Sequence, residues 1–314
     1  MVEYIGKRLL QSVVTLFIIV TVVFLLLRLL PEEGYLGAAA DKMSPEQQEI
    51  YLTNLGLRDP ILVQLGNFYV DLLKGDFGKS ITYRTDVPVM DIISDKIMYS
   101  LTFGVAAVIV SILIGVPLGI LMAQFKGRWL DRLGTGYIVF IVAVPSMVYF
   151  LLIQVYITDF FNLPMLFDED RPITWLLPLI SLSLGPIASY AMWMRRYMVD
   201  ELNKDYIKLA RAKGVKERTI MFRHVLRNAF IPLSQYLPAT ILLTITGSIY
   251  IESLYSIPGM GGLLVDAIQR QDNPLVQALV LIFSSLGIIG LFLGDVLMAL
   301  VDPRIKFGKG ESVR

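Results

Sequence analysis

Few residues in this 314-residue chain combine the chemical type and the spacing that catalysis needs. The absence of cysteine excludes thiol catalysis and cysteine-ligated metal. The single histidine, His224, has no second histidine to complete a metal site, and it stands in a basic loop instead of beside a buried serine. Asp295 is the only acid well inside an apolar segment, whereas an aspartyl protease needs two aspartates. These observations argue against a membrane enzyme.

The tripeptide Gly78-Lys79-Ser80 matches the end of a phosphate-binding P-loop. A complete P-loop also has a glycine five residues before Gly78, and Leu73 occupies that position. We therefore predict that this chain does not hydrolyse ATP itself. No cofactor or metal is expected on it.

Asp295 remains a possible intramembrane polar site, because ionisable side chains within a span are costly and often functional. The alternative is a helix–helix contact, or a position near the cytoplasmic end of the span that reaches water. A proton- or sodium-coupled carrier would usually show several intramembrane carboxylates or an arginine partner. The sequence therefore does not favour a secondary carrier.

The composition indicates a membrane protein. The chain is 55% hydrophobic and only 18% charged, against about 25% charged residues in soluble domains. Prolines interrupt several of its apolar segments and predict bent helices. We expect one all-α domain, residues 1–314, with six transmembrane helices. The six apolar segments are about 9–30, 100–125, 134–160, 175–194, 231–251 and 275–301.

The charges orient these six spans. Lys126, Arg128 and Arg132 lie in one short loop, and the acidic run 168–170 lies in the next. Basic short loops stay on the cytoplasmic side, so we expect both termini in the cytoplasm. Residues 31–99 then form a large external insert. Within it, helices are predicted to start at Ser44-Pro45 and after Asp59-Pro60, the second ending at Gly75.

The segment 195–233 carries ten lysines and arginines against four acids. Tyr206 and Leu209 fall at helical spacing, and Gly214 then breaks the pattern as a helix-terminating glycine does. A second helical pattern follows and is expected to end at Pro232. Two short helices should therefore project into the cytoplasm with an apolar face available to a partner. A solvated basic loop on anionic lipid headgroups is the alternative.

Several of these stretches resemble one family. Residues 206–214 and 222–232 are similar to the cytoplasmic loop of ABC-importer permeases, above all the B-type subunit of bacterial oligopeptide and dipeptide permeases. Residues 252–268, parts of 55–80 and the ending 301–305 also resemble that family. In the broader importer motif, Gly214 and Ala210 match, whereas Lys208 and Leu209 replace a glutamate and an alanine.

The resemblance implies a type I importer permease, in which segment 195–233 couples to the ATPase. It also implies a bacterial or archaeal inner-membrane location and a peptide cargo, with a nickel chelate as the alternative. The expected partners are a second homologous permease, two ATP-binding cassette subunits carrying ATP and magnesium, an external solute-binding protein and membrane lipid, but no nucleic acid. The expected coupling residues are Tyr206, Lys208, Ala210, Arg211, Ala212, Lys213 and Gly214.

Overall fold

The computed structural model describes residues 2–29, 31–36 and 43–301, and over these residues it contains helices and no β-strand. The C-terminal segment 302–314, expected in the cytoplasm, lies outside the described residues, as does most of the family-like ending. The long helices are α1 (Val2–Leu27), α5 (Val89–Gln124), α6 (Trp129–Ala143), α9 (Leu176–Leu202), α12 (Leu226–Leu243) and α15 (Asn273–Val301).

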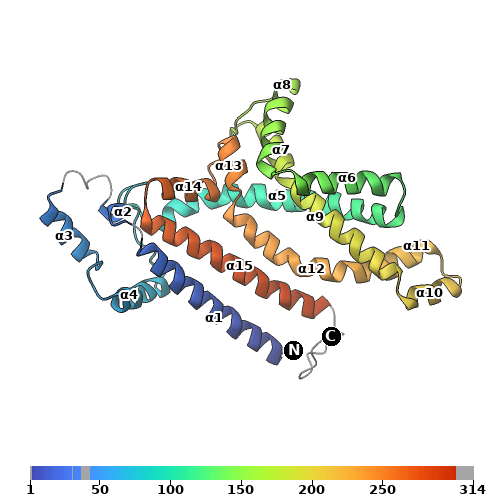
Figure 1. Ribbon diagram of the computed structural model, residues 1–314, viewed down its shortest axis with the longest axis horizontal. Coiled ribbons are helices and arrows are strands. Elements are labelled where there is room, and N and C mark those ends of the chain that lie inside the picture. Colours follow the sequence, from blue (N-terminus) through green and yellow to red (C-terminus); the bar gives the residue numbers. More distant parts are fainter. Residues whose placement is uncertain (1, 30, 37–42, 302–314) are drawn as a thin grey trace.

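Shorter helices connect or decorate this bundle (Figure 1). They are α2 (Glu33–Leu36), α3 (Pro45–Asn54), α4 (Ile61–Leu73), α7 (Ser146–Leu152), α8 (Thr158–Phe161), α10 (Asp205–Ala212), α11 (Glu217–Thr219), α13 (Ile249–Tyr255) and α14 (Met260–Gln269). π-Helical turns at Ile153–Ile157 and Ile220–Val225, and 3₁₀ turns at Pro172–Trp175 and Thr244–Thr246, join some of them.

Four helices of the described chain are long and apolar enough to cross a membrane: α1, α5, α9 and α15. Helix α6 (129–143) and the helical segment 146–161 form a bent pair, and this pair makes a fifth span if it crosses the membrane once. The bend is 107° and falls at Pro145. The residue before it, Val144, is extended, because a proline ring disfavours the helical conformation of its predecessor. The predicted proline bend is thus confirmed at Pro145.

The expected span 231–251, the fifth in chain order, corresponds to α12, which differs from the prediction at both ends and is not among the helices counted above. It begins at Leu226, inside the basic segment, and runs through Pro232 and Pro238 to Leu243. The prediction that Pro232 ends a separate short helix was therefore wrong. The π-helical turn 220–225 leads directly into α12, so the second half of the basic segment is continuous with this long helix.

Glycines set how closely two of the long helices approach each other. A Cβ atom on Gly115 of α5 would lie 2.7 Å from the carbonyl oxygen of Ile187 on α9, and one on Gly119 would lie 2.6 Å from that of Ala191. These glycines therefore permit backbone-to-backbone contact between α5 and α9. Gly136 of α6 differs from them, because no atom lies within 4 Å of such a Cβ.

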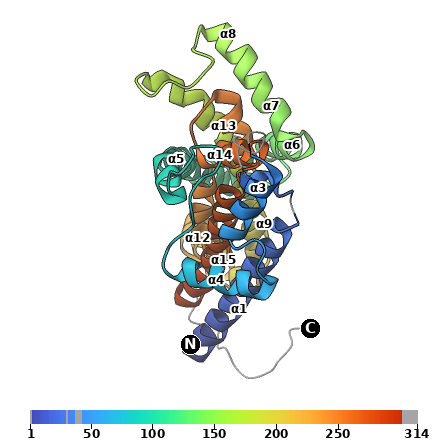
Figure 2. The same ribbon diagram turned by 90° about the vertical axis from the view of Figure 1, so that its left-hand side faces the viewer.

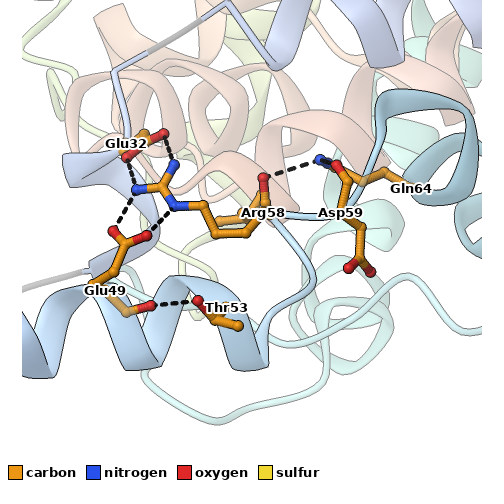
Figure 3. Close-up of polar contacts among 7 residues, drawn as sticks. Glu32, Glu49, Thr53, Arg58, Asp59 and Gln64 are labelled. Atoms are coloured by element: carbon orange, nitrogen blue, oxygen red, sulfur yellow. Dashed lines mark hydrogen bonds and ion pairs between the residues drawn. The ribbon is translucent and has the colours of Figure 1, made fainter.

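The insert between α1 and α5 is ordered by local caps and by one arginine. The predicted start of α3 is confirmed: the Ser44 hydroxyl accepts a hydrogen bond from the Gln47 N–H, and the Gln47 side chain accepts one from the Ser44 N–H. Arg58 contacts both Glu32 and Glu49, each at 2.7 Å (Figure 3). These paired contacts hold α3 to the chain that leads into α2.

Candidate functional site

Helix α10 is the projecting part of the basic segment, and it is fastened to the bundle by its inner face. Ile207 is fully buried in a cluster that includes Met198 of α9 and Val225 of the π-helical turn. Ala210, one turn later, is partly buried against the same cluster. Gly214 has a φ of 75°, and its N–H donates to the Arg211 carbonyl at 2.9 Å. The predicted helix and its terminating glycine are confirmed.

The outer face of α10 is open. The side chains of Tyr206 and Leu209, 40% and 56% exposed, share it with the exposed Lys213, at positions i, i+3 and i+7. Of the expected coupling residues, Ala210 alone lies on the packed face. The exposed ones are Tyr206, Lys208, Arg211, Ala212, Lys213 and Gly214.

A polar network joins α10 to the two long helices beside it. The Asn228 side chain on α12 donates to Glu201 of α9 at 3.1 Å and to the Tyr206 hydroxyl at 2.9 Å. That hydroxyl is also hydrogen-bonded to Glu201. The three helices are thus tied through one set of side chains. A force on the outer face of α10 would be transmitted to both α9 and α12.

Two ion pairs lie along the exposed side of α10. The Arg211 guanidinium lies 2.6 Å from the Glu217 carboxylate, across the turn that contains Gly214. Because it donates hydrogen bonds to that carboxylate, it lowers the pKa of Glu217. Lys208 pairs with Asp205 within α10 at 2.8 Å. The outer face is therefore cationic but partly neutralised by its own acids.

The sequence did not reveal a buried ion pair at the base of this region. Arg195 of α9 makes a bidentate contact with Asp131 of α6, at 2.5 and 2.9 Å. The Asp131 carboxylate also accepts the Gly127 N–H at 2.8 Å and is 6% exposed. In the sequence, Arg195 was one cation among many in a basic segment. Its separation from Asp131 along the chain gave no indication that the two would pair.

A cavity of about 280 Å³ lies among α5, α9, α12 and α13, farther along the bundle. Its walls are mainly apolar, with a few polar side chains among them. The lining includes Phe103, Leu182, Leu243, Ile251, Thr244 and Glu252. Periodicity alone could not select these residues, because nearly every face of the spans is apolar.

Glu252 is a second buried acid that sequence reasoning missed. Its carboxylate accepts hydrogen bonds from the Ser100 hydroxyl at 2.7 Å and from the N–H groups of Ser248 and Gly262, at 3.2 and 2.9 Å. A Cβ on Gly259 would lie 2.3 Å from this carboxylate. The glycines that follow Glu252 therefore make room for its side chain. This explains why the family-like segment 252–268 contains glycines.

Asp295 lies in a polar contact among three helices. Its carboxylate is 3.4 Å from Arg8 of α1 and accepts a hydrogen bond from Gln235 of α12 at 3.3 Å. The arginine partner was not foreseen, and it removes one of the two grounds on which the sequence disfavoured a carrier. The geometry agrees with the helix–helix alternative, because the carboxylate joins α15 to the two helices beside it.

The P-loop-like tripeptide leads into a segment whose hydrogen-bond donors converge on a carboxylate of this same chain. Asp272 accepts the Ser80 hydroxyl at 2.5 Å and the N–H groups of Ile81, Thr82 and Tyr83 at 2.9–3.1 Å. Converging N–H groups of this kind can bind an anion. Here the anion is the Asp272 carboxylate, which fills the position that a phosphate would need.

Apolar, proline-bent helices and a basic projection fastened to two of them describe the membrane subunit of a transporter. The family model described as binding-protein-dependent transport system inner membrane component matches residues 115–307. Its N-terminal counterpart matches residues 1–104. The chain therefore belongs to this family, the permease subunits of ABC importers, and it is not itself catalytic.

Relatives and solved structures agree with this assignment. The chain is 33% identical to the dipeptide transport system permease protein DppB of Lactococcus lactis, covering 98% of this chain and all of that protein. It is 34% identical to the glutathione transport system permease protein GsiC of Salmonella typhimurium, with the same coverage. The fold matches two inward-facing MetNI methionine ABC transporter structures, with TM-scores of 0.53 and 0.54 and 15% and 16% identity. Each match covers 68% of this chain and 97% of the other.

Proposed function

We propose that this permease imports short peptides and that α10 couples it to an ATPase subunit in the cytoplasm. The cargo follows from two relatives, named for dipeptide and for glutathione transport, which match this chain over nearly its whole length. Both cargoes are short peptidic molecules. The cavity among α5, α9, α12 and α13 would form part of the pathway, and its apolar walls suit varied peptide side chains.

The complete transporter would contain more than this chain. A second homologous permease would supply the other half of the pathway, and two ATP-binding cassette subunits would carry ATP and magnesium. An external solute-binding protein would deliver the peptide, in keeping with the family's description. The assembly would sit in a bacterial or archaeal inner membrane, with both termini of this chain and segment 195–233 in the cytoplasm and the insert 31–99 outside.

The observation that carries the coupling proposal is the division of α10 into two faces. Ile207 fastens the helix to the bundle, while Leu209 and Lys213 are exposed on the opposite side. An apolar anchor with cations around it suits a groove on a partner protein. Closure of the ATPase dimer would then move α10, and the network through Asn228 would pass that movement to α9 and α12.

Gly214 provides a test of coupling with a matched control. Its positive φ makes any side chain there costly, by about 1–2 kcal/mol. Gly75, in the insert, has a φ of 77° and equally open space around it. We expect Gly214→Val in the reconstituted complex to retain ATP hydrolysis but lose most peptide uptake, whereas Gly75→Val retains both. Normal coupled uptake by the Gly214 variant would contradict the coupling proposal.

The cargo can be tested separately, by uptake into cells that depend on this transporter. A labelled dipeptide should enter, and unlabelled dipeptide or glutathione should compete with it. Competition by a nickel chelate but not by peptides would replace the peptide proposal with the nickel alternative. Uptake by the chain alone, without an ATPase subunit, would instead return Asp295 to consideration as the site of a secondary carrier.

A further inference from the structure

Helix α4 of the insert packs against one side of α1. The Tyr69 ring stacks on Phe17 and the Phe68 ring on Phe24, each with centroids 5.1 Å apart. The Tyr69 hydroxyl donates to the Phe17 carbonyl at 3.0 Å. In both views of the ribbon, α4 is beside the body of α1 and does not extend beyond its end (Figures 1 and 2).

This position places α4 at membrane depth. Phe17 precedes Leu27, the last residue of α1, by ten residues, which corresponds to about 15 Å along a helix. The hydrocarbon core is about 30 Å thick, so a helix that touches α1 at this level lies beside the apolar part of one leaflet. The insert therefore does not stand wholly in water.

The side of α4 that faces away from α1 is apolar and exposed. Leu62 and Leu73 are 77% and 86% exposed, and Val70 between them is 49% exposed. With Gly66 they form one stripe at positions i, i+4, i+8 and i+11. Exposure of such side chains to water would forgo the burial energy that each can contribute.

A polar stripe runs beside this apolar one. Asn67, Asp71 and Lys74 follow at positions i, i+4 and i+7, and Lys74 pairs with Asp71 at 3.3 Å. The helix thus has one side on α1, one apolar side open, and one polar side. An amphipathic helix in the plane of a membrane interface has this distribution.

We propose that α4 is an interfacial helix whose stripe Leu62, Val70 and Leu73 contacts the acyl chains of the leaflet at the C-terminal end of α1. The helix that α4 packs against is itself long and apolar enough to cross a membrane, and its Ile18 and Val22 are 54% and 47% exposed. Lipid is therefore the occupant, because acyl chains that surround such a span also reach a helix packed on its side. The insert is thereby anchored in the membrane.

The lack of native cysteine makes a direct test possible. Leu73→Cys and Val70→Cys would be labelled in the full chain, assembled in its transporter and reconstituted in phospholipid vesicles. Ile50→Cys on α3 is the matched control, since that side chain is 61% exposed in the same insert. We expect a water-soluble maleimide to modify the two α4 positions about tenfold more slowly than position 50. A bimane placed at position 73 should be quenched by lipids brominated on the acyl chains.

Two results would overturn the proposal. One is equal maleimide reactivity at positions 50, 70 and 73, which would place the stripe in water. The other is slow labelling at 73 without quenching by brominated lipid, which would show that another protein covers α4. Leu73 is so exposed that its replacement should not disturb folding, so neither result could be attributed to a misfolded variant.

Discussion

The buried pair between Asp131 and Arg195 should be sensitive to the loss of either partner. Asp131→Leu would leave the Arg195 guanidinium without its bidentate carboxylate and the Gly127 N–H without its acceptor. Removing one member of a buried pair costs about 3–5 kcal/mol. The Arg195 side chain is 31% exposed, so water can solvate part of it, and we expect about 2–3 kcal/mol.

The assay is the apparent melting temperature of the purified chain in detergent. A loss of this size should lower it by about 4–6 °C, at about 2 °C per kcal/mol for a chain of this length. The double variant Asp131→Leu with Arg195→Met should recover most of the loss, because apolar side chains of similar volume can replace a buried pair. A single variant that melts within about 1 °C of the parent would refute the reasoning.

Two other predictions follow from the packing. Ile207→Ala should lower the free energy of unfolding by about 2–4 kcal/mol, because it opens a cavity under α10. Leu209→Ala, on the exposed face, should leave the melting temperature unchanged but weaken co-purification of the ATPase subunit. Equal melting temperatures for both variants would contradict this division of α10. Gly115→Val should greatly reduce the yield of folded protein, since its Cβ would lie 2.7 Å from the Ile187 carbonyl oxygen. Gly136→Val has open space and should express normally, and gel-filtration profiles would distinguish the two.

Local signals in the sequence were sufficient for some helix ends. Ser44 with Gln47 predicted the capped start of α3, and Gly214 predicted the end of α10, because caps and left-handed glycines act over a few residues. Pro232 was misleading. A proline within a membrane helix can be accommodated when neighbouring helices support the bend, and α12 continues through it.

Long-range pairs could not be predicted in the same way. Arg195 and Asp131 are 64 residues apart, and Glu252 meets Ser100 across 152 residues. In neither pair do the residues that flank one partner in the sequence indicate which residue it will contact. Asp295 was conspicuous only because it interrupts an apolar run, whereas Arg8 stood among the ordinary charges at the start of a span. Hydrophobic periodicity identifies spans, but it does not identify which polar side chains meet between them.

The N–H groups that converge on Asp272 have a consequence for hybrid permeases. The N-terminal family model covers residues 1–104 and the second covers 115–307, so a natural exchange point would be the stretch between them. Yet the backbone at 81–83 is shaped around a carboxylate that belongs to the second part. A chimera joined near residue 110 would keep its insert in place only if its second parent supplied a carboxylate at the same point before α15. The two parts of this permease therefore have to be exchanged as a matched set.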